Sequence, residues 1–190
     1  MLIREVTDVI ERFAPLAWQE SYDNAGLIVG RPDDEVHRAL LAVDVTDEVM
    51  AEAEREGCDM VITHHPIVFH ALKRFNSADQ VQRCVERAIR GGIALYACHT
   101  NLDSAPEGMS WRLAEMLGVG DLRVLQPAQA DEKVGFGVVG ELPEPMATVE
   151  FMRRMQRVLG VRVVRHSDIA SPEVRRVAVC TRSEEHTSEL

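Results

Sequence analysis

Apolar residues recur in two alternating patterns up to residue 117. Residues 2–13 carry apolar side chains at the three- and four-residue spacing of one helix face, which predicts an amphipathic opening helix. Short apolar runs then alternate with segments of helical spacing: the runs are 27–29, 39–43, 60–63 and 93–97, and the helices are 47–56, 78–90 and 107–117. This pattern predicts an α/β fold with a mostly parallel sheet that helices cover on both faces.

Capping residues define the ends of these helices. Thr46 or Asp47 is placed to cap the helix over 47–56, and the glycines at 91–92 stop the helix over 78–90. Pro106 and Gly118 flank the helix over 107–117. The element boundaries therefore rest on turn chemistry as well as on periodicity.

The pattern changes beyond Gly135. Residues 135–141 alternate as an antiparallel or edge strand does, residues 148–159 have helical spacing, and 161–164 and 174–180 are further strand candidates. The string RSEEHTSEL at 182–190 matches the translation of a common sequencing-library adapter read in frame. We therefore interpret residues 182–190 as an artefact and residues 1–181 as a single, incomplete domain.

The composition is that of a globular chain, with 46% hydrophobic and 27% charged residues among 190. The formal net charge of −10 argues against a nucleic-acid partner and suits a protein that concentrates cations. The four cysteines form no C-x-x-C pair and lie in or beside apolar runs, as reduced cysteines do. Neither a membrane-length apolar stretch nor a leader pattern occurs, so we expect a cytoplasmic protein.

Polar clusters follow three predicted strands, at 44–46, 63–66 and 99–103. Because ligands bind at the carboxyl ends of strands in open α/β sheets, we expect these clusters to converge on one edge. Imidazoles and carboxylates in such clusters are ligands of divalent ions, and zinc, iron, manganese and nickel are not distinguished. The alternative is a set of histidines that hydrogen bonds alone satisfy.

His64 and His65 are the main metal-ligand candidates. Adjacent side chains on a strand point to opposite sides, so we expect two ions, one bound by each imidazole. Asp103 is the better carboxylate ligand of its cluster, and His99 is either a third imidazole ligand or a base that orients water. Asp44 is either a ligand or a helix cap.

Two further polar segments have a structural interpretation. Asp23 and Asn24 could line the same crevice, although a turn role is favoured, and Asn101 is interpreted as a loop-shaping residue. No P-loop, G-x-S-x-G elbow or dinucleotide fingerprint occurs. The candidate chemistry therefore rests on the histidines and carboxylates.

The strings YDNAGL at 22–27, ITHHPIVF at 62–69 and HTNLD at 99–103 resemble those of the Nif-three-like family in order and spacing. Bacterial members of that family are labelled GTP cyclohydrolase 1 type 2 homologues. The resemblance covers residues 1–181 and is to the short form, without an inserted domain. It implies a Nif-three-like fold, assembled as a toroidal homohexamer whose metal sites face an internal cavity.

By the same resemblance, each site holds two divalent ions, with His64 and His65 each binding one ion and Asp103 binding one of them. Family members also continue past the position of Thr181 with further strands and helices and a His-x-x-x-Glu pair. This chain departs from that pattern at Arg182, so it is expected to lack two ligands and to bind metal more weakly.

Three functions are compatible with these residues. The first is a metal-dependent hydrolase of a nucleotide or small phosphoester, in which two ions polarise a small-molecule substrate. The second is a non-catalytic metal-binding or metal-insertion protein that works through protein partners. The third is a purely structural metal site, whose loss would lower the melting temperature.

Overall fold

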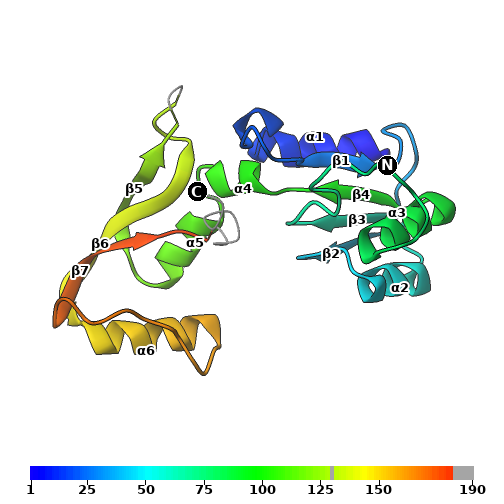
Figure 1. Cartoon of the computed structure of the whole chain (residues 1–190). Coiled ribbons are helices and arrows are strands. Elements are labelled where there is room, and N and C mark those ends of the chain that lie inside the picture. The colour runs from blue at the N-terminus through cyan, green and yellow to red at the C-terminus, as the bar shows by residue number, and fades with distance from the viewer. Residues whose placement is uncertain (129–130, 182–190) are drawn as a thin grey trace. The chain divides into compact units, whose positions relative to one another are not determined.

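The computed structural model describes residues 1–128 and 131–181, so the predicted artefact at 182–190 lies outside the described residues. The chain forms two compact units, Met1–Leu102 and the residues from Asp103 onward (Figure 1). No helix within the described ranges is long and apolar enough to cross a membrane.

The first unit is built on a four-stranded sheet with the order β1-β4-β3-β2. Its strands are β1 (Gly26–Val29), β2 (Ala39–Ala42), β3 (Met60–Thr63) and β4 (Ala94–Ala97). Strands β2, β3 and β4 are parallel, and only β1 runs antiparallel, on the edge beside β4. The predicted mostly parallel sheet is therefore confirmed.

Helices cover both faces of this sheet (Figure 1). They are α1 (Ile3–Phe13) on one face and α2 (Asp47–Glu56) and α3 (Gln80–Gly91) on the other, with a 3-10 turn, η1, at Leu16–Trp18. Two consecutive residues of β4, Leu95 and Tyr96, point to opposite faces of the sheet. Leu95 packs in the core cluster beneath α2 and α3, whereas the hydroxyl of Tyr96 donates to Glu11 of α1 over 3.3 Å.

Local sequence explains where the helices begin and end. The side chain of Thr46 accepts a hydrogen bond from the Val49 amide, so Thr46 is the N-cap of α2, and Asp79 caps α3 in the same way. Both helices end at a glycine in the left-handed conformation, Gly57 and Gly92. Each glycine ends its helix shortly before the next strand begins, β3 at Met60 and β4 at Ala94.

The second unit holds a three-stranded antiparallel sheet, β5-β6-β7. Its strands are β5 (Gly120–Pro127), β6 (Gly135–Ala147) and β7 (Glu173–Val179). Its helices are α5 (Met109–Met116) and α6 (Thr148–Leu159), and the short helix α4 (Thr100–Ser104) spans the division between the units.

This part of the chain contains one strand that was not predicted and lacks one that was. Strand β5 was not expected, because Val124 is its only buried residue and the sequence shows no apolar run there. Residues 161–164 are apolar enough for a strand but form none, and Val163 is 79% exposed. Strand formation here depends on a pairing partner more than on the side chains themselves.

Candidate metal centre

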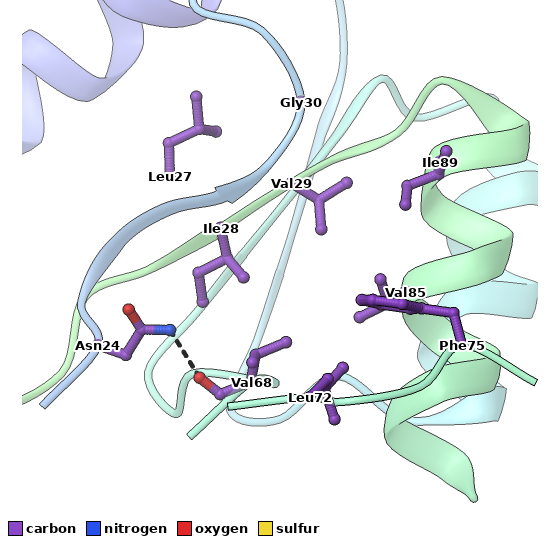
Figure 2. Close-up of a pocket in the computed structure, with 10 residues that line it drawn as sticks. All are labelled: Asn24, Leu27, Ile28, Val29, Gly30, Val68, Leu72, Phe75, Val85 and Ile89. Carbon is purple, nitrogen blue, oxygen red and sulfur yellow. Dashed lines mark hydrogen bonds between the residues drawn. The ribbon is translucent and has the colours of Figure 1, made fainter. Parts of the chain in front are cut away.

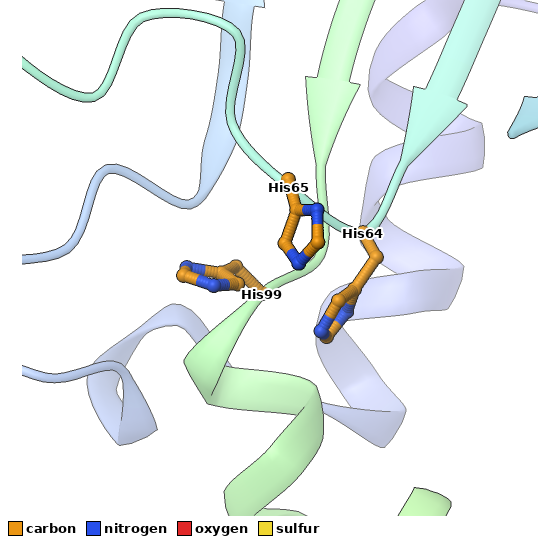
Figure 3. Close-up of side chains that lie close together, drawn as sticks. All are labelled: His64, His65 and His99. Atoms are coloured by element: carbon orange, nitrogen blue, oxygen red, sulfur yellow. The ribbon is translucent and has the colours of Figure 1, made fainter. Parts of the chain in front are cut away.

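Two segments meet at the carboxyl ends of β3 and β4. Thr63 pairs with Ala97 at the end of the parallel ladder, and the Cys98 amide continues it with a 2.8 Å hydrogen bond to the Thr63 carbonyl. His64 and His65 follow β3, and His99 follows β4. One ring nitrogen from each of these three histidines lies within 4.8 Å of the others, so they form a single cluster (Figure 3).

The two adjacent histidines do not point to opposite sides, and that expectation is wrong. Their ring centroids are 4.9 Å apart with an interplanar angle of 51°. The reason is that β3 ends at Thr63, so both residues lie in a bend beyond the pleated strand. The Thr63 hydroxyl donates to the His65 carbonyl over 2.9 Å, and the His65 amide donates to the Val43 carbonyl over 3.0 Å. These bonds hold the bend.

Hydrogen bonds fix the orientation of both rings. Nδ1 of His64 lies 2.9 Å from the Cys98 carbonyl oxygen, and Nδ1 of His65 lies 2.7 Å from Oδ1 of Asp44. A carbonyl or carboxylate oxygen only accepts, so each Nδ1 carries the proton and donates. In the neutral ring, Nε2 then bears the lone pair that a metal ion binds. Such an outer partner on Nδ1 is typical of metal-binding imidazoles.

The ring of His99 is held by a buried carboxylate. Its Nδ1 lies 2.8 Å from Oδ1 of Asp23, and the two side chains are 6% and 0% exposed. Asp23 also accepts from the amides of Thr100 and Asn24 and from the Thr100 hydroxyl. Burial raises the pKa of Asp23, but the hydrogen bonds from His99, Thr100 and Asn24 outweigh it and lower this pKa to about 2. Asp23 is therefore ionised at neutral pH.

The donor set fits a divalent ion of intermediate softness. Three imidazoles, two half-buried and one buried, meet at one place, and neutral imidazole binds zinc, iron, nickel and copper well. Metal–nitrogen bonds of about 2.0–2.1 Å require the rings to move closer together than the 4.8 Å within which their nitrogens lie. The three histidines can therefore hold a metal ion.

The remaining predicted residues have separate places. Asp44 does not cap α2, since Thr46 does. Asn101 is fully buried, accepts from the His99 amide over 2.9 Å and donates to the Ala14 carbonyl over 2.7 Å. Asp103 is buried in α4 and belongs to the second unit, and its role as a ligand stays a prediction.

Asn24 makes different contacts from its neighbour Asp23. Its side-chain amide donates to the Val68 carbonyl over 2.6 Å and lines an apolar hollow of about 520 Å³ between β1, the loop after β3, and α3 (Figure 2). Asn24 therefore contacts the loop after β3, whereas Asp23 contacts His99. Consecutive residues in this turn support different features.

Two aromatic residues that were not predicted to be functional, Tyr22 and Phe69, lie near the histidine cluster. The ring of Phe69 stands edge-on to His99 at 6.3 Å and to Tyr22 at 6.4 Å between centroids. Tyr22 is 44% exposed, whereas Phe69 is half-buried. The signals available in the sequence were their positions next to Asp23 and shortly after Pro66.

Known proteins are similar to this chain in sequence and in fold. The GTP cyclohydrolase 1 type 2 homolog of Clostridium perfringens is 31% identical over 179 residues, which cover 94% of this chain and 68% of that protein. The homolog of the same name from Streptomyces coelicolor is 36% identical over 186 residues, covering 93% and 64%. The crystal structure of Staphylococcus aureus hypothetical protein SA1388 matches with a TM-score of 0.87 at 25% identity, covering 100% of this chain and 75% of that chain.

This chain spans about two thirds of the length of these two curated relatives. The sequence profile of the Duf34/NIF3 family (NGG1p interacting factor 3) matches residues 1–187, a range that includes both histidine segments. The chain therefore belongs to the DUF34/NIF3 family.

Proposed function

We propose that this protein is a divalent-metal-dependent hydrolase whose centre is built on His64, His65 and His99. The observation that carries the proposal is the common orientation of the three rings, each with Nδ1 donating to an outer acceptor. That leaves Nε2 as the basic nitrogen of every ring in the cluster. Hydrogen bonds to these separate acceptors would not by themselves require one nitrogen of each ring to lie within 4.8 Å of the others.

We further propose a second ion, with Asp103 as its carboxylate ligand. A dinuclear centre needs ligands beyond three imidazoles, and a carboxylate supplies charge and can bridge two ions. The implied His-x-x-x-Glu pair of longer family members would complete it. The support for two ions is the resemblance in the His-Thr-Asn-Leu-Asp string at 99–103.

The protein residues prepare the site for hydrolysis. When bound, a divalent ion supplies Lewis acidity to a phosphoryl or carbonyl oxygen. Buried Asp23 holds His99 in place, and the bend after β3 holds His64 and His65, so the three rings are brought together before a metal binds. The half-buried rings of His64 and His65 give a small substrate access to the centre.

The substrate we propose is a nucleotide or a small phosphoester. The curated relatives are named for GTP cyclohydrolase, which favours a nucleotide. The net charge of −10 disfavours strong binding of a highly charged polyanion and favours a smaller ester. We also propose a cytoplasmic homohexamer on the resemblance, and light scattering in solution measures the mass of the assembly.

The test combines metal content with turnover. The purified chain is loaded with zinc, manganese, iron or nickel, its metal is counted by mass spectrometry, and hydrolysis of GTP and p-nitrophenyl phosphate is followed. We expect bound metal and turnover, both lost in a His64→Ala/His65→Ala variant. Bound metal without turnover above that variant would reject hydrolysis of these substrates and favour a metal-carrying protein. Absence of bound metal would reject the centre itself.

A further inference from the structure

Asp23 lies outside the proposed metal ligands, yet its carboxylate is fully buried against one of them, His99. It precedes β1 by three positions, far in sequence from His99, and its side chain is 0% exposed. Four donors surround its two oxygens: Nδ1 of His99 and the Asn24 amide on Oδ1, and the amide and hydroxyl of Thr100 on Oδ2. A carboxylate is the species that accepts at every one of these positions.

Three of these four bonds do not involve the histidine. Two come from backbone amides, whose direction the chain fixes. The third comes from the Thr100 hydroxyl, which itself accepts from the Glu20 amide over 3.0 Å and therefore directs its own proton to Asp23. These three bonds fix the position of the carboxylate independently of His99, so its Oδ1 is a fixed acceptor for the ring.

We infer that Asp23 is a positioning residue that holds His99 as the Nδ1–H tautomer and so directs its Nε2 lone pair into the space shared with His64 and His65. A fixed acceptor on Nδ1 excludes the tautomer with its proton on Nε2, which would present a donor to the site. This assignment of the tautomer rests on the chain alone, and its effect on metal binding rests on the proposed function.

The Asp23→Asn variant tests this role because an amide cannot replace the carboxylate here. Each carboxylate oxygen accepts from a backbone amide, so the NH₂ group of Asn meets a backbone donor in either orientation. In the orientation that faces His99, the NH₂ donates to Nδ1 and moves the ring proton to Nε2, an effect of the kind seen when a catalytic Asp becomes Asn.

Asp59→Asn is the matched control. Asp59 also accepts from two backbone amides, those of His37 and Arg38, and also lies near an imidazole, with Nδ1 of His37 at 3.6 Å. It immediately precedes β3, at the opposite end of that strand from His64. Both amides bond Oδ2 of Asp59, so the amide oxygen of the introduced Asn can keep them, and this control removes a carboxylate charge beside another imidazole without touching the histidine cluster.

The first measurement uses metal-free protein with ¹⁵N-labelled histidine, in which ring-nitrogen chemical shifts report the tautomer. We expect His99 as Nδ1–H in the wild type and in Asp59→Asn, and a shift to Nε2–H or to a mixture in Asp23→Asn. Nε2–H in the wild type would overturn the inference even if Asp23→Asn failed to fold. An unchanged tautomer in folded Asp23→Asn would also overturn it.

The second measurement is cobalt(II) binding, read from affinity and from the visible spectrum. We expect Asp23→Asn to bind about 10- to 100-fold more weakly, with an altered spectrum, and Asp59→Asn to match the wild type. Equal binding by both variants would contradict the positioning role. Failure of the wild type to bind cobalt would instead contradict the proposed metal centre and would leave the tautomer result intact.

Discussion

Oδ1 of Asp44 and Nδ1 of His65 lie 2.7 Å apart, although the residues are 21 positions apart in the chain. The parallel pairing of β2 with β3 brings them together, because Ala42 pairs with Thr63 and both residues follow two positions later. The hydrogen bond therefore follows directly from the register of the sheet, and it orients a ring of the proposed metal centre.

Replacing Asp44 is expected to weaken metal binding without unfolding the protein. Asp44 is exposed, so Asp44→Ala removes the acceptor of His65 at small cost to packing. We expect zinc affinity to fall by about 10-fold, the lower end of the range for outer partners, since the site is open to water. Calorimetric titration with zinc measures this affinity in the wild type and the variant. Asp8→Ala, an exposed carboxylate on α1, is the control, and an equal loss there would point to net charge instead of orientation.

The sequence predicted the first unit well because its signals are local. Apolar runs and caps such as Thr46 depend on neighbours in the chain, and the βα alternation then places His64, His65 and His99 at one edge. The second unit was predicted less well. The exposed strand β5 around Val124 is defined by its pairing with β6, which periodicity does not report.

The orientation of the site could not be predicted from sequence. The bend after Thr63 decides that His64 and His65 face one space, and it depends on hydrogen bonds with Val43 and between residues of the bend itself. The partner of His99 is Asp23, which lies 76 positions earlier. Such contacts follow from tertiary packing, so residue types in a motif identify candidates for a site but not their hydrogen-bond partners.

The cysteines are expected to differ sharply in reactivity. Cys180 is exposed, whereas Cys58, Cys84 and Cys98 are buried. Burial, with the negative charge of Asp47, raises the pKa of Cys84 to about 11, so its thiolate is scarce at neutral pH. Titration with a chromogenic disulfide should label one thiol quickly in the native protein and the others only after denaturation. Fast labelling should disappear in Cys180→Ser, and its persistence there would contradict the assigned burial.

Asp47 is expected to make stability depend on pH in the acid range. Its hydrogen bond from Arg83 of α3, 2.8 Å long, lowers the pKa of Asp47 below 3.8, and Arg83 and Arg87 add favourable charge. Because the folded-state pKa is depressed, this contribution to stability is present above about pH 4 and is lost as pH falls through the lower folded value.

The free energy of unfolding of Asp47→Asn should therefore lie below that of the wild type at pH 7, and the two should approach each other as the pH falls below about 4. Urea denaturation at several pH values measures this difference. Glu52→Gln on the exposed side of α2 removes the same charge and serves as the control. A difference between Asp47→Asn and wild type that stays constant from pH 7 to strong acid would contradict the ion pair as its cause.

Met50 is expected to be a major contributor to the stability of the first unit. It lies on α2, is 0% exposed and belongs to the core cluster that α2 and α3 form with the sheet, together with Val61 and Leu95. Met50→Ala removes most of a side chain from a closely packed interior and leaves a cavity, so we expect a loss of about 2–5 kcal/mol in the free energy of unfolding. Met116 on α5 is 61% exposed, and Met116→Ala should change the free energy of unfolding by less than about 0.5 kcal/mol. Denaturant melts of both variants measure this contrast, and equal effects would mean that Met50 does not pack in the core as described.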